Sequence, residues 1–188
     1  GMTTRLFYVS GELIITEIIL EQGKSDYGGA FRIYATLTTT ARVHLRRSLV
    51  RGCEATSGGG AAYVQGGDAV LILEESTLES NSAVDRGGAV YATSGAQIQV
   101  IGGKTSSIKN NKVTGLGYGG GVYLQVGASL SVSGTGTKLV VEDNTASKNG
   151  GGVFASFAST IIVSSGGQLT VTNNTAKFGG GVCLSNEG

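Results

Sequence analysis

The sequence has no proline and no tryptophan, and 14% of its 188 residues are charged. The absence of proline excludes a collagen, and 40% hydrophobic residues with so little charge are not typical of a disordered protein. The formal net charge of +1 provides no overall field that would attract nucleic acid or an anionic membrane. No apolar run approaches the roughly 20 residues of a spanning helix, and no signal peptide follows Gly1-Met2. We therefore expect one folded domain over residues 1–188, without nucleic acid or a membrane span.

Residues that commonly hold metals or carry out nucleophilic catalysis are also scarce. Cys53 and Cys183 are the two cysteines, and His44 is the one histidine. A metal site built from Cys and His needs several of them clustered, and a triad needs a histidine beside its partners. We therefore predict no metal, no other cofactor and no histidine-dependent catalytic site.

Glycine is abundant, with 33 residues, and much of it belongs to a repeat. The clearest copy is Val141–Phe154, VEDNTASKNGGGVF, in which an aliphatic residue, an Asn, a Gly run and an apolar–aromatic pair follow one another. The aliphatic residue recurs at Leu20, Val50, Leu78, Ile108, Val141 and Val171, in steps of 30, 28, 30, 33 and 30. The second residue of the apolar–aromatic pair recurs at Arg32, Tyr63, Tyr91, Tyr123, Phe154 and Cys183, in steps of 31, 28, 32, 31 and 29. Two independent markers therefore give a period of about thirty residues.

Apolar residues alternate within each repeat, which predicts strands and not helices. In one repeat they form three pairs, Val122/Leu124, Leu130/Val132 and Leu139/Val141, separated by Gly, Ser and Thr. Three short strands can close one triangular coil, and stacked coils bury the inward side chains together. We predict an all-β fold, a right-handed, three-sided parallel β-helix of about five coils plus partial terminal coils. Residues 1–20 would be a divergent first coil and 21–184 the repeats, in a fragment of a longer array.

The paired motifs resemble the polymorphic outer membrane protein repeat, whose signatures are FxxN and GGA followed by an aliphatic residue. Gly87-Gly-Ala-Val90 matches the second signature in full, whereas Gly replaces its Ala in three later copies, at Gly121, Gly152 and Gly181. An aliphatic residue stands where FxxN has Phe. The resemblance implies a β-helical passenger or surface adhesin, and hence a cell-surface or secreted location.

Stacked coils place equivalent residues above one another, so three sets of residues are predicted to form rows. An asparagine ladder at one turn would contain Asn81, Asn111, Asn144 and Asn174. Asn bonds readily to the backbone at bends, so we interpret this row as structural. A charge ladder would contain Glu21, Arg51, Glu79, Lys109 and Glu142, with the sign alternating from coil to coil on one outer face. Such alternation would help to hold the register, because a slipped pairing loses the sign match.

An aromatic stripe is the third predicted row and the predicted binding surface. Because Val90, Val122 and Val153 should point inward, alternation should point the next residue of each strand outward. The stripe contains Tyr63, Tyr91, Tyr123 and Phe154. An exposed aromatic row would suit a sugar or protein partner. The alternative is that the rings only stack across strands, or that a neighbouring loop covers them.

Three other features receive structural interpretations. Arg32, Arg42, Arg46, Arg47 and Arg51 with His44 form a local basic region, which we interpret as a solvated strand face and not a nucleic-acid site. Cys53 and Cys183 would lie about four coils, roughly 19 Å, apart, too far for a disulfide. They would replace the Asn and the aromatic residue of their repeats.

We therefore expect a non-catalytic, adhesin-like β-helix module that binds a glycan or a surface protein through an outward face. One alternative is a purely structural spacer or filament element with end-to-end contacts to neighbouring repeats. Another is a degenerate carbohydrate-active enzyme resembling pectate lyases. That enzyme needs carboxylates converging from adjacent coils, whereas Asp26 and Asp85 share a repeat place two coils apart.

Overall fold

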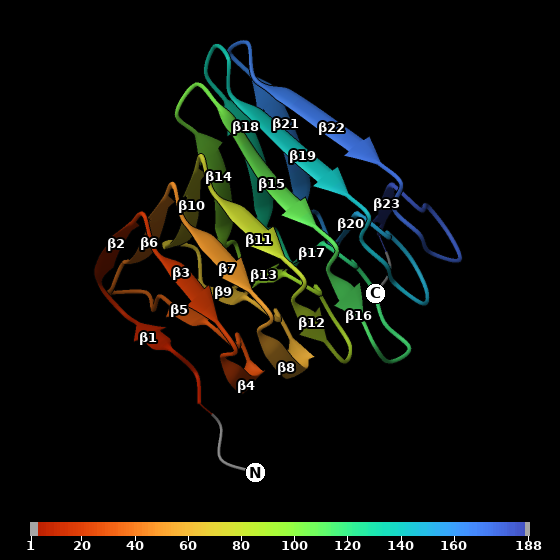
Figure 1. Ribbon diagram of the computed structural model, residues 1–188, viewed down its shortest axis with the longest axis horizontal. Coiled ribbons are helices and arrows are strands. Elements are labelled where there is room, and N and C mark those ends of the chain that lie inside the picture. Colours follow the sequence, from red (N-terminus) through yellow and green to blue (C-terminus); the bar gives the residue numbers. More distant parts are fainter. Residues whose placement is uncertain (1–3, 187–188) are drawn as a thin grey trace.

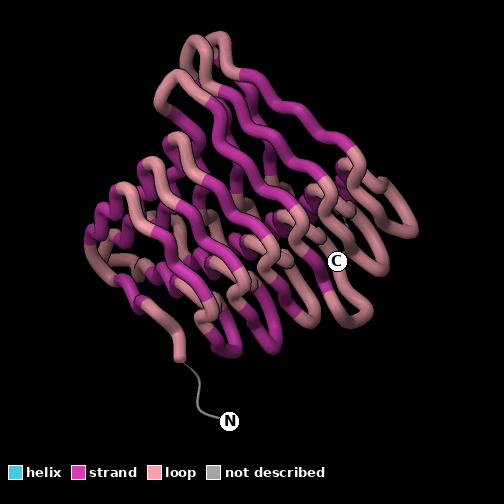
Figure 2. Tube along the Cα trace, in the orientation of Figure 1, coloured by secondary structure: helices cyan, strands magenta, loops and turns pink. Residues whose placement is uncertain are grey.

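The computed structural model describes residues 4–186 as a β-solenoid in which every regular element is a strand. Successive turns stack on one another in the order of the sequence (Figure 1). Strands from different turns line up in columns, and loops separate the columns at the corners (Figure 2). Every pairing between named strands is parallel, as expected when each turn lays its strands beside those of the turn before.

Four sheets run along the solenoid. Sheet I is seven-stranded and contains β1 (Phe7–Val9), β5 (Phe31–Tyr34), β9 (Ala62–Gln65), β13 (Val90–Thr93), β17 (Val122–Gln125), β20 (Val153–Ser156) and β23 (Val182–Ser185). Sheet II is six-stranded and contains β2 (Glu12–Thr16), β6 (Ala41–Arg46), β10 (Ala69–Glu74), β14 (Gln97–Ile101), β18 (Ser129–Ser133) and β21 (Thr160–Ser164). Sheet III is six-stranded and contains β3 (Ile19–Glu21), β7 (Leu49–Arg51), β11 (Thr77–Glu79), β15 (Thr105–Lys109), β19 (Lys138–Glu142) and β22 (Gln168–Thr172). Sheet IV is four-stranded and contains β4 (Lys24–Tyr27), β8 (Glu54–Gly58), β12 (Ser82–Ala83) and β16 (Lys112–Val113).

The described chain therefore makes six turns, since sheets II and III each hold six strands with one strand per turn. The sequence predicted about five coils with partial ends. The difference lies in the first segment, where Leu13 and Ile15 pair in register with Val43 and Leu45. This segment is a regular first turn although it lacks the glycine motif. Sheet IV was not predicted either, because its two- to five-residue strands lie in the polar gap between Asn and glycine.

The core follows the alternation of the strands. In β14, Ile98 and Val100 are fully buried, whereas their neighbours are partly exposed. Ile98 is in register with Leu71 of the turn before and Leu130 of the turn after, so the core is a stack of matching aliphatic residues. Burying such a side chain contributes about 1.5–3 kcal/mol.

Backbone geometry explains why the motif has glycine at two successive positions, for example at Gly87 and Gly88. Gly87 adopts a φ of +59°, a conformation that strains a residue bearing a Cβ. Gly88 packs against the next turn so closely that an added Cβ would lie 2.1 Å from the carbonyl oxygen of Gly120. The first glycine therefore makes the bend, and the second lets two turns approach.

Candidate functional site

The asparagine ladder lies inside the solenoid. The Nδ2 of Asn81 donates to Oδ1 of Asn111 at 3.1 Å, and Asn111 donates in the same way to Asn144 at 3.0 Å. Asn144 donates to Asn174 at 2.9 Å. Each of these amides also donates to a backbone carbonyl of the previous turn, such as that of Leu78 for Asn111. The ladder therefore satisfies buried polar groups, and its first three members are not accessible to a ligand.

A second row of hydroxyl groups was missed by the sequence reasoning. Buried Ser48, Ser76 and Ser106 occupy the same position in three successive turns, since the residues that follow them, Leu49, Thr77 and Ser107, are register partners. The backbone N–H of Ser48 donates to Oγ of Ser76 at 3.1 Å, and that of Ser76 donates to Oγ of Ser106 at 3.2 Å. These residues also recur about every thirty positions, so their period is a signal that could have revealed them. Like the asparagines, they join neighbouring turns.

The aromatic stripe is stacked but buried. Its ring centroids are 5.1 Å apart between Tyr63 and Tyr91, and 5.2 Å apart for each of the next two pairs. The exposed fractions are 7% for Tyr63, 4% for Tyr91, 2% for Tyr123 and 1% for Phe154. The prediction that these rings are exposed is therefore wrong. They point away from the main core but form a second, smaller core on the outer side of sheet I.

The residues that precede the glycine motif cover this second core. Tyr27 packs on Tyr63 with centroids 4.8 Å apart, and Tyr118 packs on Phe154 at 5.0 Å. Gly58 leaves the space that the Tyr91 ring fills, since an added Cβ would lie 2.7 Å from that ring. Burial raises the pKa of Tyr63 to about 12, because the phenolate loses its hydration there. The stripe therefore stabilises the fold, and its rings are not accessible to a ligand.

The charge ladder lies on the outer face of sheet III with its members in register. Arg51 pairs with Glu21 of the first turn at 2.9 Å, and Lys109 pairs with Glu79 at 3.4 Å. Glu79 is the register partner of Arg51, and Glu142 is the register partner of Lys109. Residues of opposite charge thus alternate along the face, as the ladder hypothesis requires.

A second charge ladder, also missed by the sequence reasoning, runs along the opposite border of sheet III. Its members are Glu17, Arg47, Glu75 and Lys104. Arg47 pairs with Glu17 at 2.7 Å, and Lys104 pairs with Glu75 at 2.9 Å. The hydrogen bond and charge of Glu17 raise the pKa of Arg47. The two ladders have the same order of signs.

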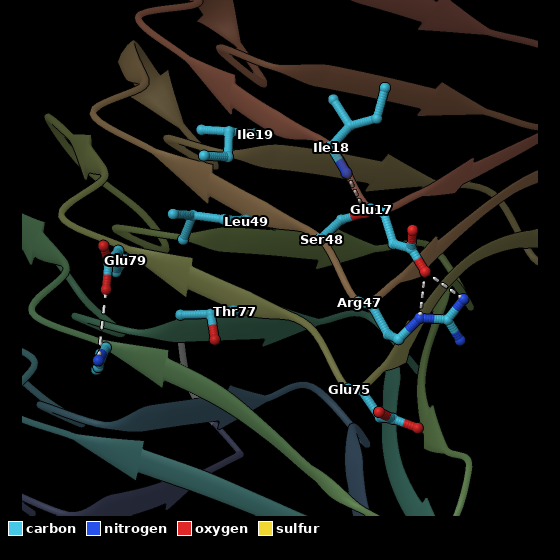
Figure 3. Close-up of a pocket in the computed structure, with 10 residues that line it drawn as sticks. Glu17, Ile18, Ile19, Arg47, Ser48, Leu49, Glu75, Thr77 and Glu79 are labelled. Atoms are coloured by element: carbon cyan, nitrogen blue, oxygen red, sulfur yellow. Dashed lines mark hydrogen bonds and ion pairs between the residues drawn. The ribbon is translucent and has the colours of Figure 1, made fainter.

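Between the ladders lies an open groove of about 610 Å³ (Figure 3). Its floor contains Ile19, Leu49 and Thr77, which are register partners on three adjacent strands. Ile19 is 58% exposed, and Ile18 beside it is also exposed. Figure 3 shows Glu17 and Arg47 joined at one border, while Glu79 lies at the other. The groove therefore presents apolar side chains between two borders of alternating charge.

Two further surfaces carry charged side chains that pair with one another. A groove of about 660 Å³ follows sheet IV, where Lys24 and Glu54 pair with each other at 3.1 Å. The basic region predicted from the sequence is largely neutralised, because Arg46 contacts Glu74 at 3.1 Å and Arg47 and Arg51 pair as described above. His44 contacts the same Glu74 at 2.8 Å. The three arginines form ion pairs between turns on the outer surface.

The remaining chemistry-bearing residues are dispersed. Among residues 4–186 no cluster of three or more His, Cys, Asp and Glu side chains could hold a metal ion. Asp26 accepts a hydrogen bond from Thr56 at 2.9 Å. Both cysteines are free; Cys53 stands at the head of the asparagine ladder, where its N–H donates to Oδ1 of Asn81 at 3.0 Å. Cys183 is in register with Phe154, at the end of the aromatic stripe.

No helix in the described part of the chain has the length and apolar character needed to cross a bilayer. Searches of curated proteins and of solved structures found no match to the chain. The sequence matches the right-handed beta helix region family over residues 31–188. Together with the stacked turns of parallel strands, this match shows that the chain belongs to the right-handed beta helix family.

Proposed function

We propose that this chain is a non-catalytic, adhesin-like module of a cell-surface or secreted protein, which contacts a partner protein through the outer face of sheet III. The observation that supports it best is the groove of Figure 3, with exposed Ile18 and Ile19 between two charge ladders. The resemblance to polymorphic outer membrane protein repeats supports the surface location. The ladders of side chains that join neighbouring turns support the role of a rigid scaffold, which would hold this face flat.

The chemistry of the groove favours a protein over a neutral glycan. Protein interfaces combine a desolvated apolar centre with a polar border, and charge complementarity selects the partner. Ile19 and Leu49 would supply the centre, and Arg51 and Glu79 would supply part of the border. The charged side chains of the groove stand at its borders, and the exposed residues between them, Ile18 and Ile19, offer no polar side-chain group to match sugar hydroxyls.

Two isoleucines of the first turn provide a matched test. Ile19 lies on the outer face of sheet III and Ile14 on that of sheet II, and each is 58% exposed. Binding of the purified chain should be measured on an array of extracellular proteins and on a glycan array. We expect hits on the protein array that Ile19→Asp removes and Ile14→Asp retains. Equal loss with both variants, or hits on the glycan array alone, would refute the proposed surface.

A structural spacer or filament element is the second candidate. It is supported by the last turn of the described chain, where Val163, Val182 and Leu184 are exposed although their equivalents in earlier turns are buried. End-to-end contact would cover them. Analytical ultracentrifugation of Leu184→Asp tests this candidate, which predicts that assembly is lost while binding to the protein array persists. Cleavage of polyuronides by the purified chain would instead support the degenerate enzyme.

A further inference from the structure

The groove of Figure 3 carries the same order of charges at both of its borders. From the first turn to the fourth, the signs run negative, positive, negative and positive in the ladder that begins at Glu17 and in the ladder that begins at Glu21. Glu142 adds a negative charge to the second of these in the fifth turn, and Thr172 is its neutral register partner in the sixth. A face whose sign changes with every turn can be the electrostatic complement of itself.

Two copies can place these faces against each other about a twofold axis in two ways. If the axis runs along the solenoid, each turn meets the same turn of the second copy, and the ladder of Glu21 meets the ladder of Glu17. Every such contact joins like charges, because the two ladders have the same order of signs. If the axis runs parallel to the strands, each ladder meets itself with its turns reversed. An axis between two turns then joins only opposite charges, because the turns that meet differ by an odd number.

The largest overlap of the two faces fixes the position of this axis. Between the third and fourth turns, it makes all six turns of one copy face the six turns of the other in reverse order. Glu79 then faces Lys109 of the second copy, and Arg51 faces Glu142 of the second copy. The ladder at the other border matches in the same way, since its third turn is acidic and its fourth is basic. Each contact occurs twice because the axis is twofold.

The floor of the groove is also compatible with a second copy. Its central row continues past Thr77 through Ser107 and Val140, which are register partners. Reversed about the same axis, Leu49 faces Val140 of the second copy and Thr77 faces Ser107, so that apolar meets apolar and hydroxyl meets hydroxyl. Ile19 meets the last turn at the rim of the contact. Packed sheets lie about 10 Å apart, and side chains of both copies fill that distance.

We propose that the outer face of sheet III binds a second copy of this chain, with the turns of the two copies in opposite order. This inference rests on the proposed function, because it names the partner of the same face. Six strands at ~4.8 Å spacing and about five residues of each at ~3.3 Å give an area of roughly 400–500 Å² on each copy. Twice this area is below the roughly 1,200–2,000 Å² of stable complexes, so the dimer should be weak and reversible.

Sedimentation equilibrium of the purified chain tests the dimer at concentrations from about 5 to about 500 µM. We expect a monomer–dimer equilibrium that weakens at least about tenfold between about 0.05 and about 0.5 M NaCl, because salt screens the ladders. Lys109→Glu and Glu79→Lys should each weaken it at least about tenfold, since each makes both contacts between positions 79 and 109 repulsive. Lys112→Glu makes the same change of charge at an exposed residue of sheet IV and should leave the dimer unchanged.

A mixture of two variants separates contact between copies from damage to the fold. When Lys109→Glu and Glu79→Lys are mixed in equal amounts, the acidic position 109 of one variant faces the basic position 79 of the other. The mixture should therefore regain the dimer that each variant alone has lost. A monomer at every concentration, single variants that dimerise like the original chain, or a mixture that stays monomeric would each overturn the proposal.

Two further measurements separate the dimer from the functions proposed above. Leu184→Asp, at the last strand of sheet I, should retain the dimer, and loss of association in this variant would overturn the proposal in favour of end-to-end contact. A monomeric chain whose protein-array hits are removed by Ile19→Asp would refute the dimer and leave the proposed function intact. A dimer with the expected variants in a chain that gives no array hits would support this proposal and refute contact with a different protein.

Discussion

Replacing Asn111 with alanine removes the centre of the asparagine ladder. Its Oδ1 accepts from the N–H of Asn81 at 2.9 Å and from the Nδ2 of Asn81 at 3.1 Å. Its Nδ2 donates to the carbonyl of Leu78 and to Oδ1 of Asn144, each at 3.0 Å. The variant therefore loses four hydrogen bonds, all of them in a buried part of the solenoid.

The cost follows from what remains unpaired. A typical hydrogen bond contributes a net ~1 kcal/mol, and a buried group left without a partner costs about 1–3 kcal/mol. The N–H of Asn81 has no other partner once Asn111 is shortened, whereas Asn144 still accepts from the N–H at position 111. We therefore expect Asn111→Ala to lower the free energy of unfolding by roughly 3–5 kcal/mol, a large part of the usual 5–15 kcal/mol.

Urea denaturation followed by circular dichroism measures this loss, and Asn174→Ala is the matched control. Asn174 ends the ladder and is partly exposed, so water can replace some of its bonds. We expect its substitution to cost about half as much. A loss below about 1 kcal/mol for Asn111→Ala, or a larger loss for Asn174→Ala, would refute the reasoning that the ladder stabilises the fold.

Three further predictions concern other ladders and the glycine motif. Burial raises the pKa of Tyr63 to about 12 from an unfolded value near 10, so the folded protein holds this proton more tightly than the unfolded chain. The free energy of unfolding should therefore be unaffected below pH 10 and should fall by up to ~2.7 kcal/mol as the pH rises through 12. Tyr63→Phe should reduce this pH dependence in urea titrations at pH 9 and 11. Arg51→Glu, between two acidic neighbours, should cost about 1 kcal/mol at low salt and less at 1 M salt, and a salt-independent loss would contradict an electrostatic cause. Gly88→Ala should lower the free energy of unfolding by roughly 3 kcal/mol, because its Cβ would meet the backbone of Gly120. Gly67→Ala is the control and should have little effect, because the space around Gly67 is open. Equal melting temperatures for the two variants would disprove the close-packing explanation.

The rows themselves could be predicted from the sequence because a solenoid converts the period into spatial contact. Residues about thirty positions apart, such as Asn81 and Asn111, lie above each other once the turns stack. Alternation then separates the two faces of each strand. The second charge ladder and the row of Ser48, Ser76 and Ser106 follow the same logic, because their members also recur about every thirty positions.

The alternation of residues along the strands could not predict that other residues bury the aromatic stripe. Alternation places Tyr91 on the outer side of sheet I, but it does not say whether another segment packs there. The available signal was the aromatic residue directly before three glycine pairs, at Tyr27, Tyr118 and Phe178. Two of these rings do contact the stripe, Tyr27 through Tyr63 and Tyr118 through Phe154. Two aromatic rows at neighbouring repeat positions should therefore have predicted a second core.

Departures from a row are the informative positions in such a fold, because most polar groups within a row already have partners. Cys53 replaces an asparagine without leaving a donor unpaired, since its N–H still bonds to Asn81. Arg32 replaces a ring and keeps an unpaired, buried Nε among three tyrosines. The fold explains the first departure by this hydrogen bond. It explains the second by cation–π contacts, because the rings of Tyr8, Tyr34 and Tyr63 surround the guanidinium and offset part of the cost of its unpaired Nε.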